Sequence, residues 1–114
     1  MNDRIDIDWE QLHQVSEDDP EFELELLTML AEDVKLHIED LRQAVIDGDA
    51  TAIAHEAHYI KGSSANVGVR QIATLAKQLE QLAHEQSLSD TSATLVEQMA
   101  VEVGNLEAYL VSRG

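Results

Sequence analysis

Apolar residues recur at helical spacing over most of the 114-residue chain. The first long stripe consists of Phe22, Leu26, Leu27, Leu30, Val34, Ile38, Leu41 and Val45. Spacing of this kind gives an α-helix one apolar face. Asp19 is suited to cap this helix, Pro20 to its first position and Gly48 to its C-terminal end. We therefore predict a long helix between Pro20 and Gly48.

Three further stripes follow in the rest of the chain. Asp49 can cap a helix whose apolar stripe is Ile53, Ala57, Ile60, Ser64 and Val67, with Gly68 closing it. The next helix carries Ile72, Leu75, Ala76, Leu79 and Leu82. The last follows the loop "SLSD", has Asp90 as its predicted cap, and carries Leu95, Met99, Val103, Leu106 and Leu110.

Four amphipathic helices joined by short connections bury their apolar stripes best as an antiparallel bundle. A shorter apolar segment, about residues 5–15, predicts an extra N-terminal helix held down by Trp9 and Leu12. The sequence thus predicts an all-α fold, an up-down four-helix bundle over about residues 20–112. One domain is expected to comprise residues 1–114.

The stretch "AHYIKGSSANVG", residues 57–68, places weak helix formers inside the second predicted bundle helix. Either Gly62 ends a helix and Ser63 caps a new one, or the helix continues to Val67. The apolar stripe stays in phase across Gly62, whereas a break would shift it. We therefore favour the continuous helix.

On a continuous helix, Lys61 and Gly62 lie three and four residues after His58, so both neighbour its side chain. The missing side chain at Gly62 leaves space for a bulky group to approach the imidazole. Lys61 supplies a positive charge within reach of an anion at that place. The free energy lost by placing glycine in a helix would be the cost of access to His58.

The net charge of the chain limits the classes of partner that it can bind. It has 23 acidic and 7 basic residues and a formal net charge of −16, which disfavours nucleic acid and anionic membrane surfaces. Residues 49–86 are almost neutral, and an anionic group such as phosphate would be least repelled there, although chance clustering explains the same charges. The chain has no cysteine, which excludes disulfides, thiolate metal sites and a cysteine nucleophile. No 18-residue apolar run or apolar signal core is present, so we expect a cytoplasmic protein.

The segment His58-x-x-Lys61-Gly62-Ser63-Ser64-Ala65-Asn66-Val67-Gly68 resembles the signature of histidine-containing phosphotransfer (HPt) domains. The resemblance includes the Asp-Pro helix start, "LAEDV", "LRQAVIDGD" and "LAKQLEQLA", and covers about residues 8–110. It implies a phosphorelay intermediate. An exposed histidine would accept a phosphoryl group from a receiver-domain aspartate, or from a histidine kinase, and pass it to another receiver.

Carried over residue by residue, the resemblance makes His58 the phosphoacceptor and Lys61 the residue that stabilises the phosphoryl group. Gly62 would permit close approach, and Glu80 would orient the imidazole. The implied partners are receiver domains of response regulators or hybrid kinases, which would dock on a surface that includes Leu36, Ala54, Ala65, Val69 and His84. No cofactor is expected on this chain, because Mg²⁺ would belong to the receiver.

Two alternatives to the relay carrier stay open. One is a helical adaptor that binds partners without phosphotransfer, and the other is the phosphoacceptor module of a chemotaxis-type kinase. Because a degenerate adaptor would be expected to lose His58, its presence favours the carrier. The carrier would be a monomer without kinase activity of its own, and its start at Met1 favours a standalone protein.

A metal site is not predicted. His55 lies one turn before His58, but di-iron bundle sites need two Glu-x-x-His motifs, and only Glu10–His13 has that spacing. His13 and His37 are expected at the surface or at its boundary.

Overall fold

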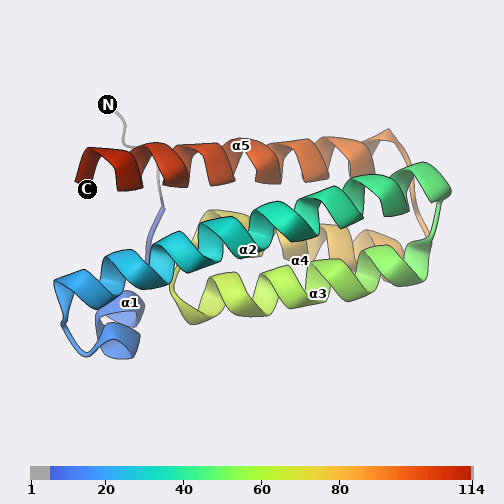
Figure 1. Cartoon of the computed structure of the whole chain (residues 1–114). Coiled ribbons are helices and arrows are strands. Elements are labelled where there is room, and N and C mark those ends of the chain that lie inside the picture. Colours follow the sequence, from blue (N-terminus) through green and yellow to red (C-terminus); the bar gives the residue numbers. More distant parts are fainter. Residues whose placement is uncertain (1–5, 114) are drawn as a thin grey trace.

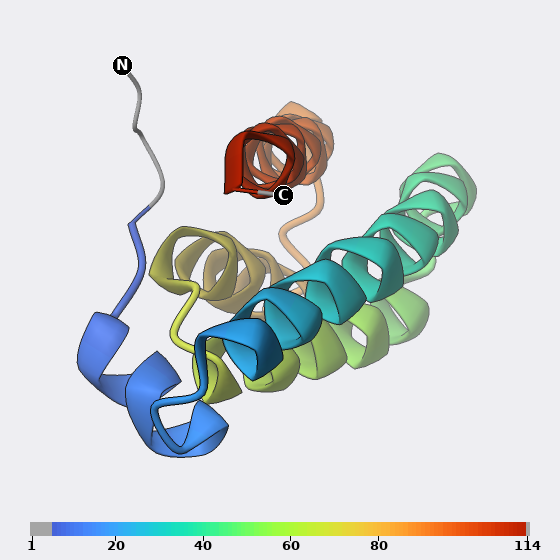
Figure 2. The same cartoon turned by 60° about the vertical axis from the view of Figure 1, so that its left-hand side comes forward.

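The computed structural model describes residues 6–113, and most of this range is helical. The helices are α1 (Trp9–Ser16), α2 (Pro20–Asp47), α3 (Ala50–Asn66), α4 (Arg70–His84) and α5 (Asp90–Arg113), shown in Figure 1. The four long helices run alongside one another, and α1 lies across one end of them (Figure 2). Among residues 6–113, no helix has the length and apolar character needed to cross a membrane. The predicted all-α bundle with a short extra helix is confirmed.

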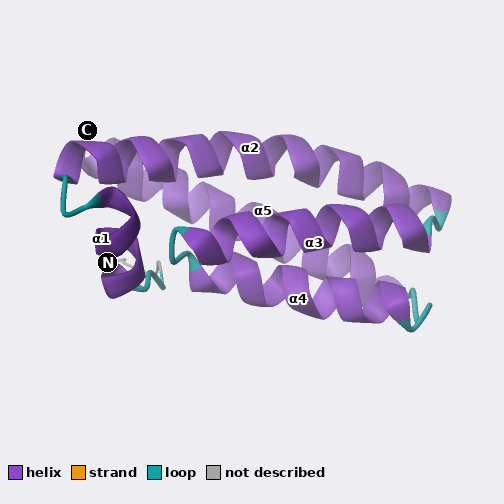
Figure 3. Cartoon of the chain, turned by 90° about the horizontal axis from the view of Figure 1, so that it is seen from below, coloured by secondary structure: helices purple, strands orange, loops and turns teal. Residues whose placement is uncertain are grey.

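The four long helices form a closed ring of neighbours. Helix α2 packs against α3 and α5, and α4 packs against the same two helices. Figure 3 shows α3 and α4 side by side, with α1 at the end where the chain turns from one to the other. Successive helices run in opposite directions because their connections are too short to return along the bundle.

Local capping chemistry defines the bounds of α2 and α3. The Asp19 carboxylate accepts hydrogen bonds from backbone N–H groups two and three residues on, at 3.1 and 3.3 Å, and Pro20 occupies the first turn. Gly48 ends α2 with a φ of 66°, in the left-handed region. Asp49 caps α3 by accepting the N–H of Ala52 at 3.0 Å. These predicted caps are confirmed.

The predicted cap of the last helix is wrong by one residue. Helix α5 already includes Asp90, and the Ser89 hydroxyl accepts the N–H of Thr91 at 3.2 Å. Serine and aspartate are both good cap residues, so "SLSD" offers two adjacent choices that composition alone does not separate.

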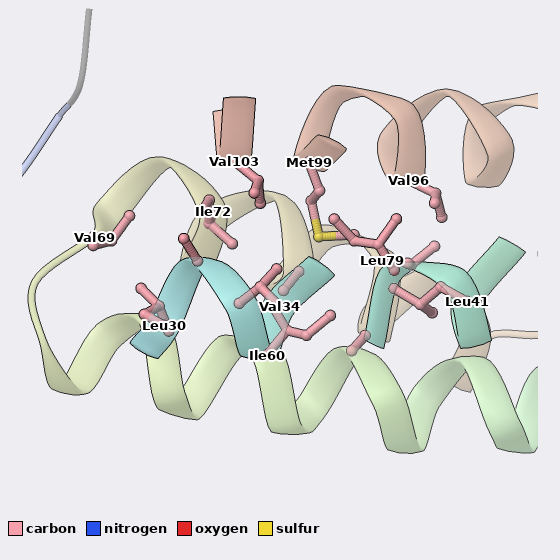
Figure 4. Packing of buried hydrophobic residues seen from close by; sticks show 14 of the residues in the cluster. Leu30, Val34, Leu41, Ile60, Val69, Ile72, Leu79, Val96, Met99 and Val103 are labelled. Atoms are coloured by element: carbon pink, nitrogen blue, oxygen red, sulfur yellow. The ribbon is translucent and has the colours of Figure 1, made fainter. Parts of the chain in front are cut away.

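The core lies between the four long helices, where the predicted stripes converge (Figure 4). Fully buried side chains come from every long helix, including Val34, Leu41, Ile60, Ile72, Leu79, Val96 and Met99. The stripe of α2 is less complete than predicted, because Phe22 is exposed. Phe22 lies in the first turn of α2, which extends past the turn between α3 and α4 (Figures 1 and 3). Neither α3 nor α4 therefore faces Phe22 and buries its side chain.

The N-terminal helix begins later than predicted. Residue 5 lies outside the described range, and α1 starts at Trp9 after Asp8 caps it. Ile7 pairs with Val69 in an isolated antiparallel bridge, and the N–H of Asp8 donates to the Gly68 carbonyl at 2.7 Å. Residues 6–8 are thus extended because they pair with the α3–α4 turn.

Of the two side chains predicted to hold down the N-terminal helix, only one is buried. Leu12 is fully buried, as predicted, but Trp9 is exposed. The Trp9 ring lies 6.2 Å from the rings of both His13 and Tyr109. Leu12 therefore supplies the buried anchor of α1, and the exposed Trp9 ring lies beside Tyr109 of α5.

Candidate functional site

His58 projects from the flank of α3, and its side chain is 69% exposed. Helix α3 runs without interruption from Ala50 to Asn66, so the continuous helix favoured by the sequence is confirmed. Apart from its chain neighbours and the backbone of its own helix, a methyl group built at Gly62 would find no atom within 4 Å. The surface one turn beyond His58 is therefore open to an approaching molecule.

The carboxylate of Glu80, on α4, bridges the two polar side chains of the α3 motif. Its Oε2 lies 2.8 Å from His58 Nδ1, and its Oε1 accepts a hydrogen bond from Lys61 Nζ at 2.6 Å. The Glu80 side chain is only 13% exposed, in contrast to the His58 ring. The imidazole is thus held on its inner side by a largely buried group while its outer side faces solvent.

This contact decides which ring nitrogen is free. An ionised carboxylate can only accept hydrogen bonds, so the proton of a neutral His58 ring resides on Nδ1. Nε2 then keeps its lone pair and can attack an electrophile. The geometry makes His58 a preoriented nitrogen nucleophile.

The environment of Glu80 keeps it ionised. The hydrogen bond from Lys61 lowers the pKa of Glu80 most, and the hydrogen bond from His58 and the charges of both partners act in the same direction. Partial burial opposes these effects, but the net result is a pKa below the ordinary value of 4.5. The carboxylate is therefore available as an acceptor at neutral pH.

A shallow groove of about 560 Å³ lies beside His58, between α3 and α4. Ala54, His55, Glu80 and His84 are among the residues that line it. His84 Nε2 lies 3.6 Å from the same Glu80 oxygen that faces His58. One carboxylate oxygen therefore lies between two exposed imidazoles.

The predicted docking residues divide into three groups. Ala54 and His84 line the groove next to His58, as the sequence suggested. Leu36 and Ala65 are exposed but lie outside the groove lining. Val69 is buried, and its assignment to the docking surface is wrong. Its side chain is covered because Ile7 pairs with it, a contact between distant parts of the chain.

Thr51 and His55 also line the groove, although the sequence pattern indicated no surface role for Thr51 and only a metal-binding alternative for His55. They precede His58 by seven and three residues, which is helical spacing on one face. That signal was present in the sequence. The lining residues Ala83 and Gln86 carry no such signal, because their position depends on how α4 packs against α3.

Comparison with known proteins agrees with this geometry. The family model described as Hpt domain matches residues 25–109. Among solved structures, the chain is similar to histidine-containing phosphotransfer protein B (HptB) from Pseudomonas aeruginosa PAO1. The TM-score is 0.83, with 30% sequence identity over 95% of this chain and 93% of that chain. A search of curated proteins found no match. Because the family model covers most of the bundle and the whole His58 site, we conclude that this chain belongs to the Hpt domain family of phosphorelay proteins.

Proposed function

We propose that this protein accepts a phosphoryl group on Nε2 of His58 and passes it to a receiver domain. The observation that carries the proposal is the contact between the exposed His58 ring and the ionised Glu80, at 2.8 Å. It leaves one nucleophilic nitrogen facing solvent on a flank without a competing side chain at Gly62.

The proposed accepting step uses an aspartyl phosphate of a receiver as donor. The Nε2 lone pair attacks phosphorus, an N–P bond forms, and the P–O bond to the aspartate breaks. The aspartate leaves as a carboxylate, and its electron pair goes with it. The ring becomes positively charged, and Glu80 stabilises that charge through the Nδ1 proton, which stays in place. Transfer to the next receiver reverses these bond changes.

Lys61 is proposed to stabilise the phosphorylated form. A phosphoryl group adds about −1.5 to −2 charges near neutral pH. The Lys61 ammonium lies one turn from His58 and is partly exposed, so it can contact a phosphoryl oxygen while remaining near Glu80. We assign the assisting Mg²⁺ to the receiver, so this chain acts as a carrier without kinase activity of its own.

We propose that a monomer of this chain docks a receiver over the α3–α4 groove. Ala54 and His84 line the groove, and Ala65 follows His58 by two helical turns on the same side of α3. Leu36 is 70% exposed on α2 and would contact the edge of the same partner. An Ala54→Arg variant should weaken receiver binding, whereas Val101→Arg, on α5, should not. Equal binding by both variants would contradict this docking surface.

The function can be tested with purified components. Wild-type protein incubated with a phosphorylated receiver should gain an acid-labile, base-stable phosphate, and His58→Gln should gain none. His55→Gln is the matched control, because His55 lines the same groove. If His58→Gln accepts phosphate as well as wild type, the proposal is wrong.

The same assay separates the two alternatives. An adaptor would bind the receiver without gaining phosphate. A chemotaxis-type module would gain phosphate from a kinase and ATP but not from a phosphorylated receiver. Only transfer of phosphate from the phosphorylated receiver to His58 supports the relay role.

A further inference from the structure

A second cluster of polar side chains lies between α2 and α3, separate from the His58–Glu80 pair. His37 and Asp40 on α2 and Glu56 on α3 bring one ligand atom each within 4.8 Å of one another. The His37 and Glu56 side chains are 26% and 20% exposed, while Asp40 is exposed. We propose that this cluster binds a divalent transition metal ion, with Zn²⁺ as the probe ion.

The donor set fits this class of metal. One imidazole nitrogen and two carboxylate oxygens are ligands that Zn²⁺ uses, and a water molecule can complete a four-coordinate site. Ca²⁺ requires six or more oxygen ligands, and Mg²⁺ prefers oxygen and water. The exposed Asp40 leaves the cluster open to an ion that enters from solvent.

The other side of the His37 ring supplies an independent indication. His37 Nδ1 faces Glu56, and Nε2 lies 3.7 Å from Asp33 Oδ1. The second Asp33 oxygen accepts a hydrogen bond from the Tyr59 hydroxyl at 2.6 Å, and the Tyr59 ring lies 4.3 Å from the His37 ring. Metal-bound histidines typically direct their other N–H to a carboxylate, which fixes the tautomer. Asp33 Oδ1, at 3.7 Å, is beyond hydrogen-bond distance, but a small approach would bring it into this role, and Nδ1, which contacts Glu56 in this structure, would bind the ion.

Charge also favours a cation here. A neutral His37 has one ring proton and can donate to only one of the carboxylates that face its two nitrogens. Even a protonated ring would offset only one of the three negative charges of Asp33, Asp40 and Glu56. A divalent ion bound by Nδ1, Asp40 and Glu56 would satisfy the donors and compensate the charge at once.

Two other histidines in contact with glutamate lack this combination. His13 contacts Glu23, and the same glutamate oxygen accepts a hydrogen bond from the Ser16 hydroxyl, with no second carboxylate in the cluster among residues 6–113. At the phosphoacceptor site, the Lys61 ammonium already contacts Glu80 and repels a metal ion. The His37 cluster thus differs from the His13 pair by its second carboxylate ligand, and from the His58 site by the absence of a contacting lysine or arginine among the described residues.

The test uses the full chain, stripped of metal with a chelator and then titrated with ZnCl₂ by calorimetry. Wild type should bind one Zn²⁺ with a melting temperature that rises with Zn²⁺ concentration, since the ion joins α2 to α3. His37→Gln and Glu56→Gln should each weaken binding at least tenfold. Asp33→Asn should weaken it by roughly 10- to 100-fold through the orientation of His37.

His13→Gln and His84→Gln are the matched controls, and both should bind Zn²⁺ as wild type does. Circular dichroism of each variant at 25 °C shows whether it is folded. If His37→Gln is unfolded, Glu56→Gln serves as the test variant in its place. Absence of binding by wild type at millimolar Zn²⁺ overturns the proposal. Loss of binding in His84→Gln but not in His37→Gln also overturns it, because the ion would then be in the groove. Mg²⁺ binding as strong as Zn²⁺ binding overturns the transition-metal assignment.

Discussion

Glu80 Oε2 lies 2.8 Å from Nδ1 of His58, although the two residues are 22 positions apart and on different helices. The relationship joins a largely buried anion to an exposed ring. It fixes the proton on the inner nitrogen and leaves the outer nitrogen free. The chemistry proposed for this protein depends on that division of the imidazole into two unlike sides.

Removal of the Glu80 side chain should slow phosphotransfer more than neutralising it. Glu80→Ala deletes the acceptor for the Nδ1 proton, and we expect a loss on the order of 100-fold in the rate of transfer from a phosphorylated receiver. Glu80→Gln keeps an acceptor oxygen but loses the charge that stabilises the phosphorylated ring, so its loss of rate should be smaller than that of Glu80→Ala. Rapid-quench kinetics would measure both. Equal losses in the two variants would show that charge, not orientation, is what Glu80 supplies.

Glu80 should also make stability depend on pH. Its pKa is lowered in the folded protein, chiefly by the hydrogen bond from Lys61, so the ionised form is favoured by folding. This contribution is fully present above the ordinary pKa of 4.5 and is lost as pH falls through the lower folded value. The difference in unfolding free energy between wild type and Glu80→Gln, from urea titrations, should therefore be larger at pH 7 than at pH 3. A difference that grows on acidification would contradict the assignment.

Gly62→Ala should stabilise the protein and impair its function. The new methyl group meets no atom within 4 Å, so the helix gains roughly 1 kcal/mol from the better propensity of alanine. The same methyl group narrows the approach to His58 and should slow transfer. Gly104→Ala on α5 is the control, because it also has open space and should stabilise without affecting transfer. An unchanged rate of phosphotransfer in Gly62→Ala would show that Gly62 is not needed for access to His58.

Lys61→Ala should slow phosphotransfer or shorten the phosphohistidine lifetime, by on the order of tenfold or more. The reason is that the ammonium one turn from His58 no longer offsets the phosphoryl charge. Lys77→Ala, at an exposed position of α4, is the control for a general loss of positive charge. Radiolabelled phosphate followed over time would give both quantities. Identical kinetics and lifetimes in wild type and Lys61→Ala would exclude Lys61 from the mechanism.

Gly68→Ala should destabilise the fold. Gly68 has a φ of +82°, and a methyl group there would lie 2.6 Å from the Asp8 carbonyl oxygen. We expect a loss of about 1–3 kcal/mol from backbone strain, plus the cost of displacing the N-terminal segment. Gly48→Ala has a similar φ of +66° but no contact within 4 Å, so it should cost only roughly 1 kcal/mol. Urea unfolding of the two variants would isolate the Asp8 contact, and equal losses would show that it contributes nothing.

Several errors of the sequence interpretation share one cause. Val69 was placed on the docking surface, and the first helix was started near residue 5. Both errors arise because Ile7 pairs with Val69, a contact between segments that lie far apart in the sequence. Helical periodicity describes only neighbours within a few turns and cannot reveal such a pairing.

The helices, three of their caps and the cluster of His58, Lys61 and Gly62 follow from the order of residues alone. These follow from interactions within one helical turn, which the order of residues fixes directly. The cluster of Asp33, His37 and Asp40 has the same property, since positions four and three residues apart lie on one face of α2.

Which partner each of these faces meets depends on how the helices pack. Glu80 reaches His58 because of the register of α4 against α3, and Glu56 reaches His37 because of the rotation of α3 against α2. Register and rotation are set by the packing of the whole core, in which buried side chains of neighbouring helices constrain one another. A local pattern therefore predicts the nucleophile, while the groups that orient it depend on how the bundle packs.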